Sequence, residues 1–540
     1  MSQATSQVRG VSPGALERWE PVIGLEVHLQ LKTQSKIFCA CSTRFGDPPN
    51  QNTCPVCLGL PGSLPVLNKK ALELAVRAAL ALNCTVQEKS RFARKNYFYP
   101  DLPKGYQISM YEQPLATGGW LEIGADGKRK RVGITRLHLE EDAAKNLHEG
   151  FPDSAEKSYI DFNRCGVPLV EIVSEPDLRS PVGAYAYLTT LKQVLEYTEA
   201  SDCNMEEGSL RCDANVSVRP RGAEQLGTKT EVKNLNSFRY LQRALEYEIG
   251  RHIEVLEAGG RVEQETRLWN LSEGRTESMR SKEFAHDYRY FPEPDLLPVR
   301  VSEEWKAQIR TAMPELPEAK RARLVQQHGI TPYDAGVLAD SRALADYFEA
   351  VVRAGAPPKL AANWIETEVL RSEFFKAALS SSERVWELPV KTVGEAVRRL
   401  EESAAESQRV AQEKVGNRLM NCSSQLPSPV RLAGLLKLFH GGALSGSLAK
   451  SIFWKMVEKG QSAEEVIAAE GLTQVSDVGA IEQWAREVIA ANPENAAKYR
   501  AGNEGVFKFF VGQVMRLSRG QANPQVVNDT LKRLLASKGG

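Results

Sequence analysis

Short runs in which apolar and polar residues alternate dominate the first half of the chain. The clearest runs span residues 22–31, 132–139, 169–173, 212–218 and 228–233. Because successive side chains of a strand point to opposite faces, each run predicts a β-strand with one apolar face. Turn-forming residues separate the runs, so we expect them to pair as an antiparallel sheet.

Longer periodic segments predict helices. Residues 69–82 are amphipathic and rich in Ala and Leu, while residues 181–198 follow Ser180 and begin with Pro181, a typical N-cap and first helical residue. After about residue 302, segments rich in Glu, Ala and Arg indicate further helices. The expected fold class is α+β, with an N-terminal antiparallel-sheet domain, a helical domain and an all-helical C-terminal tail domain.

A chain of 540 residues is too long for one core, so two to four domains are expected. The changes in pattern predict a disordered N-terminus at 1–18, a sheet domain at 19–294, a helical domain at 295–420 and a tail domain at 430–540. Residues 422–429 are rich in Ser and Pro and predict a linker before the tail.

Several predicted strands carry polar side chains on the face opposite their apolar residues. In the run 22–31, Glu26 and His28 share that face, about 7 Å apart along the strand. The run 169–173 places Glu171 among apolar neighbours. The other polar positions are Arg136, His138 and Glu140, with Glu141 and Asp142 at the end of the same run, then Arg211, Asp213, Asn215, Ser217 and Arg219, and finally Lys229, Glu231 and Lys233.

Two interpretations of these polar faces are open. On any single strand, a solvated outer face is the ordinary pattern of an antiparallel sheet and is favoured. Five strands with the same arrangement favour a common site, because buried charges must be paired or bound to a metal. Carboxylates without thiolates suit Mg²⁺ or Mn²⁺, and interleaved Arg and Lys suit phosphate oxygens. The pattern therefore indicates a site for a metal–nucleotide complex.

Two segments combine aromatic and basic residues. Residues 94–101 (RKNYFYPD) and 287–295 (DYRYFPEPD) could stack on a base or ribose and contact phosphate. Alternatively, they form surface turns with packed aromatic rings. The sequence has no Gly-x-x-x-x-Gly-Lys-Ser/Thr loop, so a nucleotide would be bound without this standard phosphate loop.

Four cysteines form two close pairs, Cys39 with Cys41 and Cys54 with Cys57. Two such pairs across a Gly/Pro/Asn-rich stretch suit a tetrahedral zinc ion. Structural zinc is favoured over reduced buried thiols and over a redox Cys-x-x-Cys, which leaves the first pair unexplained. Four thiolates leave no open coordination position, so catalytic zinc is not expected. The other cysteines, at positions 84, 165, 203, 212 and 422, are interpreted as small core residues.

Composition narrows the class of partners. A hydrophobic content of 42% and a charged content of 25% are ordinary for a soluble globular protein. The net charge is +1, so a nucleic acid would need a local basic patch, which Lys508, Arg516 and Arg519 could supply. No apolar run approaches the roughly 18 residues that span a bilayer, so no membrane partner is expected. No targeting signal is recognisable, and a cytoplasmic location is expected.

Together these motifs resemble one family, the B subunits of glutamyl/aspartyl-tRNA amidotransferases, over nearly the whole chain. The resemblance implies a cradle domain that carries the ATP and Mg²⁺ site, a helical domain, and a tail domain that grips tRNA. The matching segments are 22–28 (VIGLEVH), 94–101, 134–142 (ITRLHLEED), 171–177 (EIVSEPD), 205–215 (MEEGSLRCDAN), 231–238 (EVKNLNSF), 287–295 and 520–524 (GQANP).

The resemblance also implies a reaction, that of an ATP-dependent carbon–nitrogen ligase. The B subunit would use ATP and Mg²⁺ to activate the side-chain carboxylate of Glu-tRNA(Gln) and/or Asp-tRNA(Asn) as an acyl phosphate. Ammonia would be released from glutamine by the A subunit, which is an amidase, and would reach the B subunit through an internal channel to form the amide. A small C subunit would join the other two into a heterotrimer.

Roles for individual residues follow from the same resemblance. Catalysis is implied for Glu26, His28, Glu140, Glu141 and Glu171. Mg²⁺ ligands would be Glu26, His28, Glu141, Glu171, Asp213 and Glu231, although His28 could instead contact a phosphoryl group. Nucleotide contacts would come from Lys95, Arg136, Asp213, Glu231 and Lys233, tRNA contacts from Lys508, Arg516 and Arg519, and structural Zn²⁺ ligands from Cys39, Cys41, Cys54 and Cys57.

One departure and two rival functions accompany this interpretation. Residues 380–429 form a segment longer than usual for the family, with a helix expected at 398–415. A non-catalytic tRNA-binding scaffold is one rival, but clustered acids repel a phosphate backbone unless a metal is present. A metal-dependent phosphohydrolase is the other, and it leaves the basic tail without a role.

Overall fold

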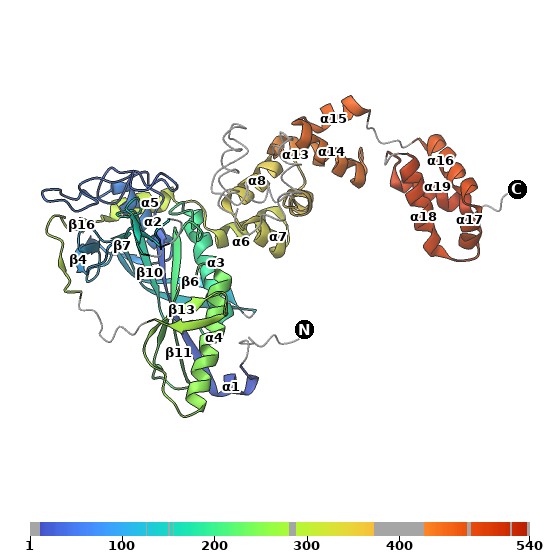
Figure 1. Ribbon diagram of the computed structural model, residues 1–540. Coiled ribbons are helices and arrows are strands. Elements are labelled where there is room, and N and C mark those ends of the chain that lie inside the picture. The colour runs from blue at the N-terminus through green and yellow to red at the C-terminus, as the bar shows by residue number, and fades with distance from the viewer. Residues whose placement is uncertain are drawn as a thin grey trace. The chain divides into compact units, whose positions relative to one another are not determined.

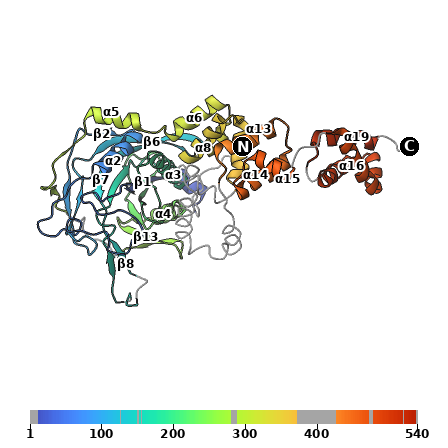
Figure 2. The ribbon, with the colours of Figure 1, turned by 90° about the horizontal axis from the view of Figure 1, so that it is seen from above.

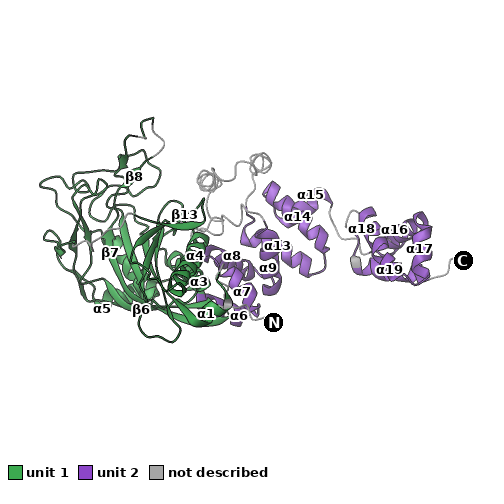
Figure 3. Ribbon diagram, turned by 60° about the horizontal axis from the view of Figure 1, so that its bottom comes forward, with its two compact units in different colours: residues 1–317 green, residues 318–540 purple. Residues whose placement is uncertain are grey.

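The computed structural model describes residues 11–125, 127–148, 152–154, 156–279, 288–371, 426–471, 477–518 and 521–536 (Figure 1). The chain divides into two compact units, residues 1–317 and 318–540 (Figure 3). The expected helix at 398–415 and the first half of the expected linker, residues 422–425, lie outside the described residues.

Twelve strands form one sheet within the described part of unit 1. All five predicted strands are present at its centre, as β1 (Trp19–Gln30), β7 (Lys128–Glu141), β10 (Pro168–Ser174), β11 (Leu210–Pro220) and β12 (Thr230–Lys233). They follow the order β12-β11-β1-β10-β7, and each neighbouring pair is antiparallel. The sheet is completed by β2 (Thr85–Val86), β4 (Ala93–Asn96), β5 (Tyr106–Ser109), β6 (Ala116–Ala125), β13 (Thr266–Asn270), β14 (Arg275–Ser278) and β15 (Phe291–Pro292).

Helices cover one face of this sheet. The predicted helices are present as α2 (Lys69–Ala81) and α3 (Pro181–Tyr197), and α3 runs beside α4 (Phe238–Glu257) against the strands (Figures 1 and 2). The Ser180 hydroxyl accepts a hydrogen bond from the Gly183 amide, which stabilises the start of α3. Apolar residues of β1, α3 and α4 share one core.

Alternation along β1 separates this core from the polar face. Leu25, Val27 and Leu29 are at most 1% exposed and belong to the core, whereas Glu26 and His28 are half-buried on the other face. The sheet is thus anchored by burial of its apolar face, which fixes the strand register and therefore the side chains presented on the opposite face.

Unit 2 is helical throughout its described residues. One core joins α7 (Pro332–Leu338), α8 (Arg342–Arg353), α9 (Pro358–Trp364), α13 (Pro429–His440), α14 (Gly446–Lys459) and α15 (Ala463–Glu470), together with residues of α6 (Pro317–His328). A separate core joins α16 (Val478–Ala491), α17 (Pro493–Arg500), α18 (Phe507–Leu517) and α19 (Pro524–Ala536). The α+β fold class is confirmed. Among the described helices, none combines the length and the apolarity needed to cross a membrane.

Candidate active site

Four central strands bring polar residues into one row across the sheet. His28 of β1 pairs in register with Arg211 of β11 on one side and with Glu171 of β10 on the other. Glu171 in turn lies opposite His138 of β7. Neighbouring strands lie about 4.8 Å apart, so these side chains of distant segments become direct neighbours. The polar faces inferred from single strands therefore converge.

Three of the expected catalytic residues form a candidate metal site. Single ligand atoms of His28, Glu140 and Glu171 all lie within 4.8 Å of one another. His28 Nδ1 lies 3.4 Å from Glu140 Oε1. His138 Nε2 lies 3.4 Å from Glu171 Oε2 and 3.7 Å from Glu140 Oε2, so it contacts both carboxylates.

The electrostatics of this cluster favour a bound cation. Burial opposes the charged imidazolium, but the Glu140 and Glu171 carboxylates outweigh burial and raise the pKa of His28. Burial would also raise the pKa of Glu140, which is 4% exposed, but His138 and His28 hold it well below its usual value. One imidazole nitrogen and two carboxylates form a donor set that fits Mg²⁺ or Mn²⁺, which would take the place of the His28 proton.

A second polar group lies beside this cluster on the same face. Glu26 Oε1 accepts a hydrogen bond from Asn215 Nδ2 at 2.8 Å, and Glu26 lies in register with Asp213. Lys233 Nζ lies 3.1 Å from Asp213 Oδ2 and 3.2 Å from Glu231 Oε1. Glu26, Asp213 and Glu231 were expected as Mg²⁺ ligands. In the structure, the Asn215 amide contacts the first of these carboxylates, and Lys233 contacts the other two.

Glu141, expected as a catalytic and metal-binding residue, lies on the other side of β7. Its carboxylate forms an ion pair with Lys104 and accepts a hydrogen bond from the Ile108 amide at 2.8 Å. Adjacent residues of a strand point to opposite faces, so Glu140 and Glu141 cannot both reach His28. Glu141 therefore lies outside the group formed by His28, Glu140 and Glu171.

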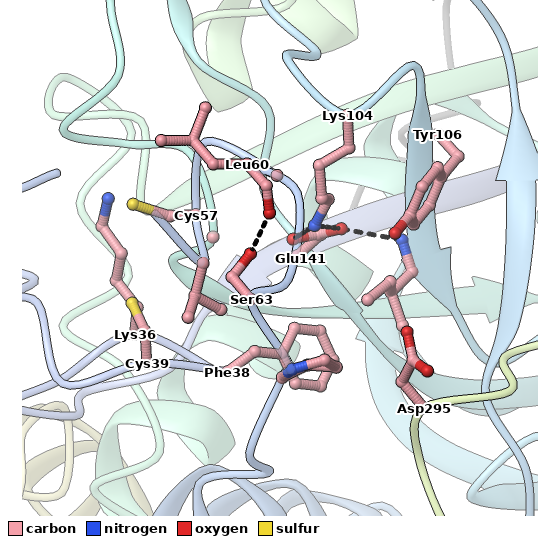
Figure 4. Close-up of a pocket in the computed structure, with 15 residues that line it drawn as sticks. Lys36, Phe38, Cys39, Cys57, Leu60, Ser63, Lys104, Tyr106, Glu141 and Asp295 are labelled. Atoms are coloured by element: carbon pink, nitrogen blue, oxygen red, sulfur yellow. Dashed lines mark hydrogen bonds and ion pairs between the residues drawn. The ribbon is translucent and has the colours of Figure 1, made fainter. Parts of the chain in front are cut away.

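The Lys104–Glu141 pair borders a small cavity of about 60 Å³. Figure 4 shows these two side chains pointing toward each other, with Cys57 on the other side of the cavity. Both charged side chains are buried, at 7% and 2% exposed. This cavity therefore lies between the sheet and the cysteine-rich segment, on the side of β7 away from the His28 cluster.

The two aromatic-basic segments lie next to each other. Phe291 of β15 pairs with Arg94 of β4, and the Arg94 guanidinium donates hydrogen bonds to Glu293 at 2.7 and 2.9 Å. Lys95 Nζ lies 4.8 Å from the centre of the Tyr288 ring. Most of these aromatic rings pack against one another, as the second interpretation of the segments expected.

One aromatic pair joins the second segment to Tyr111. The rings of Tyr111 and Tyr290 stack with centres 4.0 Å apart. Burial is the main cause that raises the pKa of Tyr290, and the Glu140 and Glu171 carboxylates add to it.

The four paired cysteines converge into a second metal-ligand cluster. The sulfur atoms of Cys39, Cys41, Cys54 and Cys57 lie within 4.8 Å of one another. A hydrogen bond with Cys39 lowers the pKa of the Cys57 thiol to about 4, and burial raises the pKa of Cys41 to about 11. Four sulfurs at these distances could hold one tetrahedral metal ion. Of the remaining cysteines, those at 84, 165, 203 and 212 are buried as expected, and Cys422 lies outside the described residues.

Comparison with known proteins decides the family. Residues 21–307 match the family model of the GatB/GatE catalytic domain, and residues 346–535 match that of the GatB domain. The chain is 51% identical over 521 residues to the aspartyl/glutamyl-tRNA(Asn/Gln) amidotransferase B subunit of Carboxydothermus hydrogenoformans, which covers 96% of this chain and all of that protein. Proteins with the same name from Geobacter sulfurreducens and Brevibacillus brevis are 50% and 48% identical, covering 96% and 97% of this chain and 99% and 100% of theirs.

The chain belongs to the B-subunit family of aspartyl/glutamyl-tRNA(Asn/Gln) amidotransferases.

In this member of the B-subunit family, two of the three residues expected to contact tRNA lie in the described part of the chain. Lys508 and Arg516 are exposed on α18, while Arg519 lies outside the described residues.

Sequence reasoning on this B-subunit chain gave no role to two residues of the polar face. His138 was placed with Arg136 and Glu140 by alternation, but it was not expected to touch both cluster carboxylates. Arg211 was placed on the outward face of its strand without a role. Alternation was the available signal for both, and register across four strands, which gives each its partners, is not readable from one strand alone.

Proposed function

We propose that this chain is the component of a tRNA-dependent amidotransferase that activates a carboxylate carried on tRNA. The substrates would be Glu-tRNA(Gln) and/or Asp-tRNA(Asn), and the products Gln-tRNA(Gln) and/or Asn-tRNA(Asn). The main support for this proposal is the cluster of His28, Glu140 and Glu171 on the polar face of the sheet. Membership of the B-subunit family supports the choice of substrate class.

The chemistry requires two displacements. A carboxylate oxygen of the aminoacyl side chain attacks the γ-phosphorus of ATP, the new O–P bond forms, and the bond to the ADP oxygen breaks. The ammonia nitrogen then attacks the carbonyl carbon of the acyl phosphate, inorganic phosphate leaves, and the nitrogen loses a proton to give the amide. Phosphorylation is needed because a carboxylate oxygen is otherwise a poor leaving group.

Residues of the polar face divide this work. His28, Glu140 and Glu171 would hold Mg²⁺, which neutralises phosphate charge when bound. His138 holds both carboxylates in place through its contacts at 3.4 and 3.7 Å. Lys95 and Arg136 would bind phosphate oxygens, and Arg136 Nη2 lies 3.4 Å from Glu171. Nucleotide contacts would further come from Glu26, Asp213, Glu231 and Lys233.

The remaining assignments complete the proposed complex. The chain works in the cytoplasm, together with an A subunit, the amidase that supplies ammonia from glutamine, and a small C subunit. Residues 19–294 form the catalytic cradle, 295–420 a helical domain and 430–540 the tail that binds tRNA. One structural Zn²⁺ is held by the four clustered cysteines, whose thiolate set leaves no position for substrate.

Single-turnover assays of the assembled complex test this function. With Glu-tRNA(Gln) and ammonium in excess, the wild-type complex should form ADP and the amide only when charged tRNA is present. E171Q should retain tRNA binding and glutamine hydrolysis but lose carboxylate activation by about 100-fold or more, since an electrostatic contact to the transition state is removed. Ammonium should not rescue E171Q, because the block precedes attack by ammonia.

E175Q is the matched control for E171Q. Glu175 follows the same strand, is exposed, and accepts a hydrogen bond from the Thr135 hydroxyl at 2.8 Å. E175Q should turn over like the wild type. ATP hydrolysis without charged tRNA would favour the phosphohydrolase, and tRNA binding without ADP formation would favour the scaffold. Equal rates for E171Q and E175Q would reject the metal assignment.

A further inference from the structure

Two arginines flank the candidate metal site on the polar face of the sheet. Arg211 extends from β11, beside His28, and Arg136 extends from β7. Three inter-strand spacings of about 4.8 Å separate β11 from β7, or about 14 Å in total. Two long side chains that approach from the two ends of this span can reach one anion between them. Arg136 is a proposed phosphate contact, whereas Arg211 takes no part in the function proposed so far.

One nitrogen of the Arg211 guanidinium is held in place by a hydrogen bond. Its Nη2 donates a hydrogen bond to Asp142 Oδ2 at 2.7 Å. Asp142 is 3% exposed, and the same Oδ2 accepts a second hydrogen bond from Gln30 Nε2, also at 2.7 Å. The carboxylate that orients Arg211 is therefore itself fixed by β1 and cannot turn away freely.

The rest of the Arg211 guanidinium has unused donors. Among the described residues, Nε is buried without a hydrogen-bond partner and Nη1 has none either. The side chain is nevertheless 35% exposed, so its outer part faces open space. Arg136 repeats this arrangement: Nη2 lies 3.4 Å from Glu171, Nε is buried and unpartnered, and the side chain is 33% exposed. A planar guanidinium with free donors suits a phosphate group.

Arg219 shows what a purely structural arginine looks like on the same strand and face. Its Nε and Nη2 donate to Glu20 at 2.9 and 2.7 Å, and its Nη1 donates to the Glu224 carbonyl at 3.1 Å. Every nitrogen of the Arg219 fork thus has a partner within the protein. Arg211 differs because only its Nη2 has a hydrogen-bond partner in the described part of the chain. Burying unsatisfied donors is costly, so the free donors of Arg211 need an explanation.

The charges around Arg211 bear on where a bound polyphosphate can lie. Burial lowers the pKa of its guanidinium, but Asp142, Glu140 and Asp213 outweigh burial and raise it. Arg211 is therefore a fixed cation between the metal-binding carboxylates and the Asp213 group. Polyphosphate approaching so many carboxylates meets repulsion unless cations such as these are placed beside them.

We infer that Arg211 contacts a phosphate group of the bound nucleotide during phosphoryl transfer, with Asp142 as the residue that positions it. This inference rests on the proposed function. Arg211 Nη1 donates to phosphate oxygens from the β11 side while Arg136 does so from the β7 side. Charge that develops on the transferred group then lies between two guanidinium groups and the metal site.

The test compares R211A, R211K and R219A in the assembled complex. In single-turnover ADP formation with charged tRNA, R211A should be about 100-fold slower than R219A, the expected loss for one transition-state donor. R211K keeps the charge but not the planar fork, so its rate should fall between those of R211A and the wild type. Added guanidinium ion should restore part of the R211A rate and none of the R219A rate.

Direct binding separates this inference from the proposed function. Mg²⁺ with a non-hydrolysable ATP analogue should bind R211A more weakly than R219A, whether or not any turnover occurs. Equal affinities, and equal rates where the wild type turns over, would overturn the role of Arg211. A wild-type complex without tRNA-dependent ADP formation would instead reject the proposed function. If R211A does not fold, R211K takes its place, and a wild-type rate and affinity in R211K would overturn the role of Arg211.

Discussion

The carboxylates of Glu140 and Glu141 belong to consecutive residues and lie on opposite sides of β7. Glu140 lies 3.4 Å from His28, in the candidate metal site, whereas Glu141 forms a buried ion pair with Lys104 beside a separate cavity. The strand thus supplies one carboxylate to each of two differently built environments. Substitutions at these neighbouring positions should therefore have different consequences.

Loss of the Glu141 charge should reduce stability. E141Q leaves Lys104 buried without its counter-ion, which typically costs about 3–5 kcal/mol in free energy of unfolding. The double variant K104M/E141L should be closer to the wild type, because apolar residues remove both buried charges. Urea unfolding of the three proteins measures these differences in the free energy of unfolding.

E122Q provides the control for that stability measurement. Glu122 pairs with Arg129 at the surface, where the side chains are 28% and 74% exposed. Loss of such a pair should change the free energy of unfolding by less than about 1 kcal/mol. A change in E141Q as small as that in E122Q would show that the Lys104–Glu141 pair contributes little.

The clustered cysteines should bind one zinc ion per chain. C57S should lose the metal and lower the melting temperature, because metal binding contributes directly to folding. C84A should keep its zinc, since Cys84 lies apart from the cluster in the core. Elemental analysis of the purified proteins and thermal melts give the answer; wild-type protein without zinc and with four reactive thiols would count against the site.

Stability of unit 1 should depend on the ionisation of Glu248. Burial would raise its pKa, but hydrogen bonds from His252, Arg251 and Thr276 lower it to about 2. The carboxylate is fully buried and also lies 3.1 Å from Arg267 Nε. Because the folded-state pKa lies below the unfolded-state value, the stabilisation is complete above about pH 4.5 and is lost as pH falls toward 2.

E248Q should remove this pH dependence. The difference between a pKa of about 4.5 in the unfolded chain and about 2 in the folded protein corresponds to about 3 kcal/mol. The variant should be less stable than the wild type at pH 7, and the difference should shrink as the pH approaches 2. Melting curves of both proteins at a series of pH values test this, and a constant difference across the series would contradict it.

Charge reversal on α18 should weaken tRNA binding. K508E/R516E removes two exposed cations, so affinity should fall and the slope of log K against log salt should become shallower by about 2. ATP binding should not change. R310E, which alters an exposed arginine of α5 (Glu303–Ala312) in the other unit, should leave tRNA affinity near the wild-type value. Equal effects of the two variants on tRNA affinity would show that tRNA does not bind specifically at α18.

Alternation made much of this fold and site predictable. The run around Glu26 and His28 has a strict period of two, and burial of Leu25 and Val27 leaves those polar residues a single possible face. Motif resemblance and alternation together predicted His28, Glu140 and Glu171 as residues of the active site. The grouping of four cysteines followed from their spacing, because metal-ligand geometry is local to the two pairs.

Partners across the sheet were harder to foresee. The same alternation separates Glu140 from Glu141, but resemblance to a motif carried both into one site. Lys104 comes from a loop far from β7 in sequence, and the register that brings Arg211 toward Asp142 depends on two intervening strands. Such contacts are set by packing of the whole sheet rather than by any local run.

Mn²⁺ titration of the full chain, followed by electron paramagnetic resonance without nucleotide, tests the central claim most directly. The wild type should bind one Mn²⁺ at the site formed by His28, Glu140 and Glu171. E140Q should bind it at least about 10-fold more weakly, given that even changes outside the ligand set cost 10-fold or more. E141Q, where folded, should bind it like the wild type. Wild-type affinity in E140Q, or loss of Mn²⁺ in folded E141Q, would contradict the account.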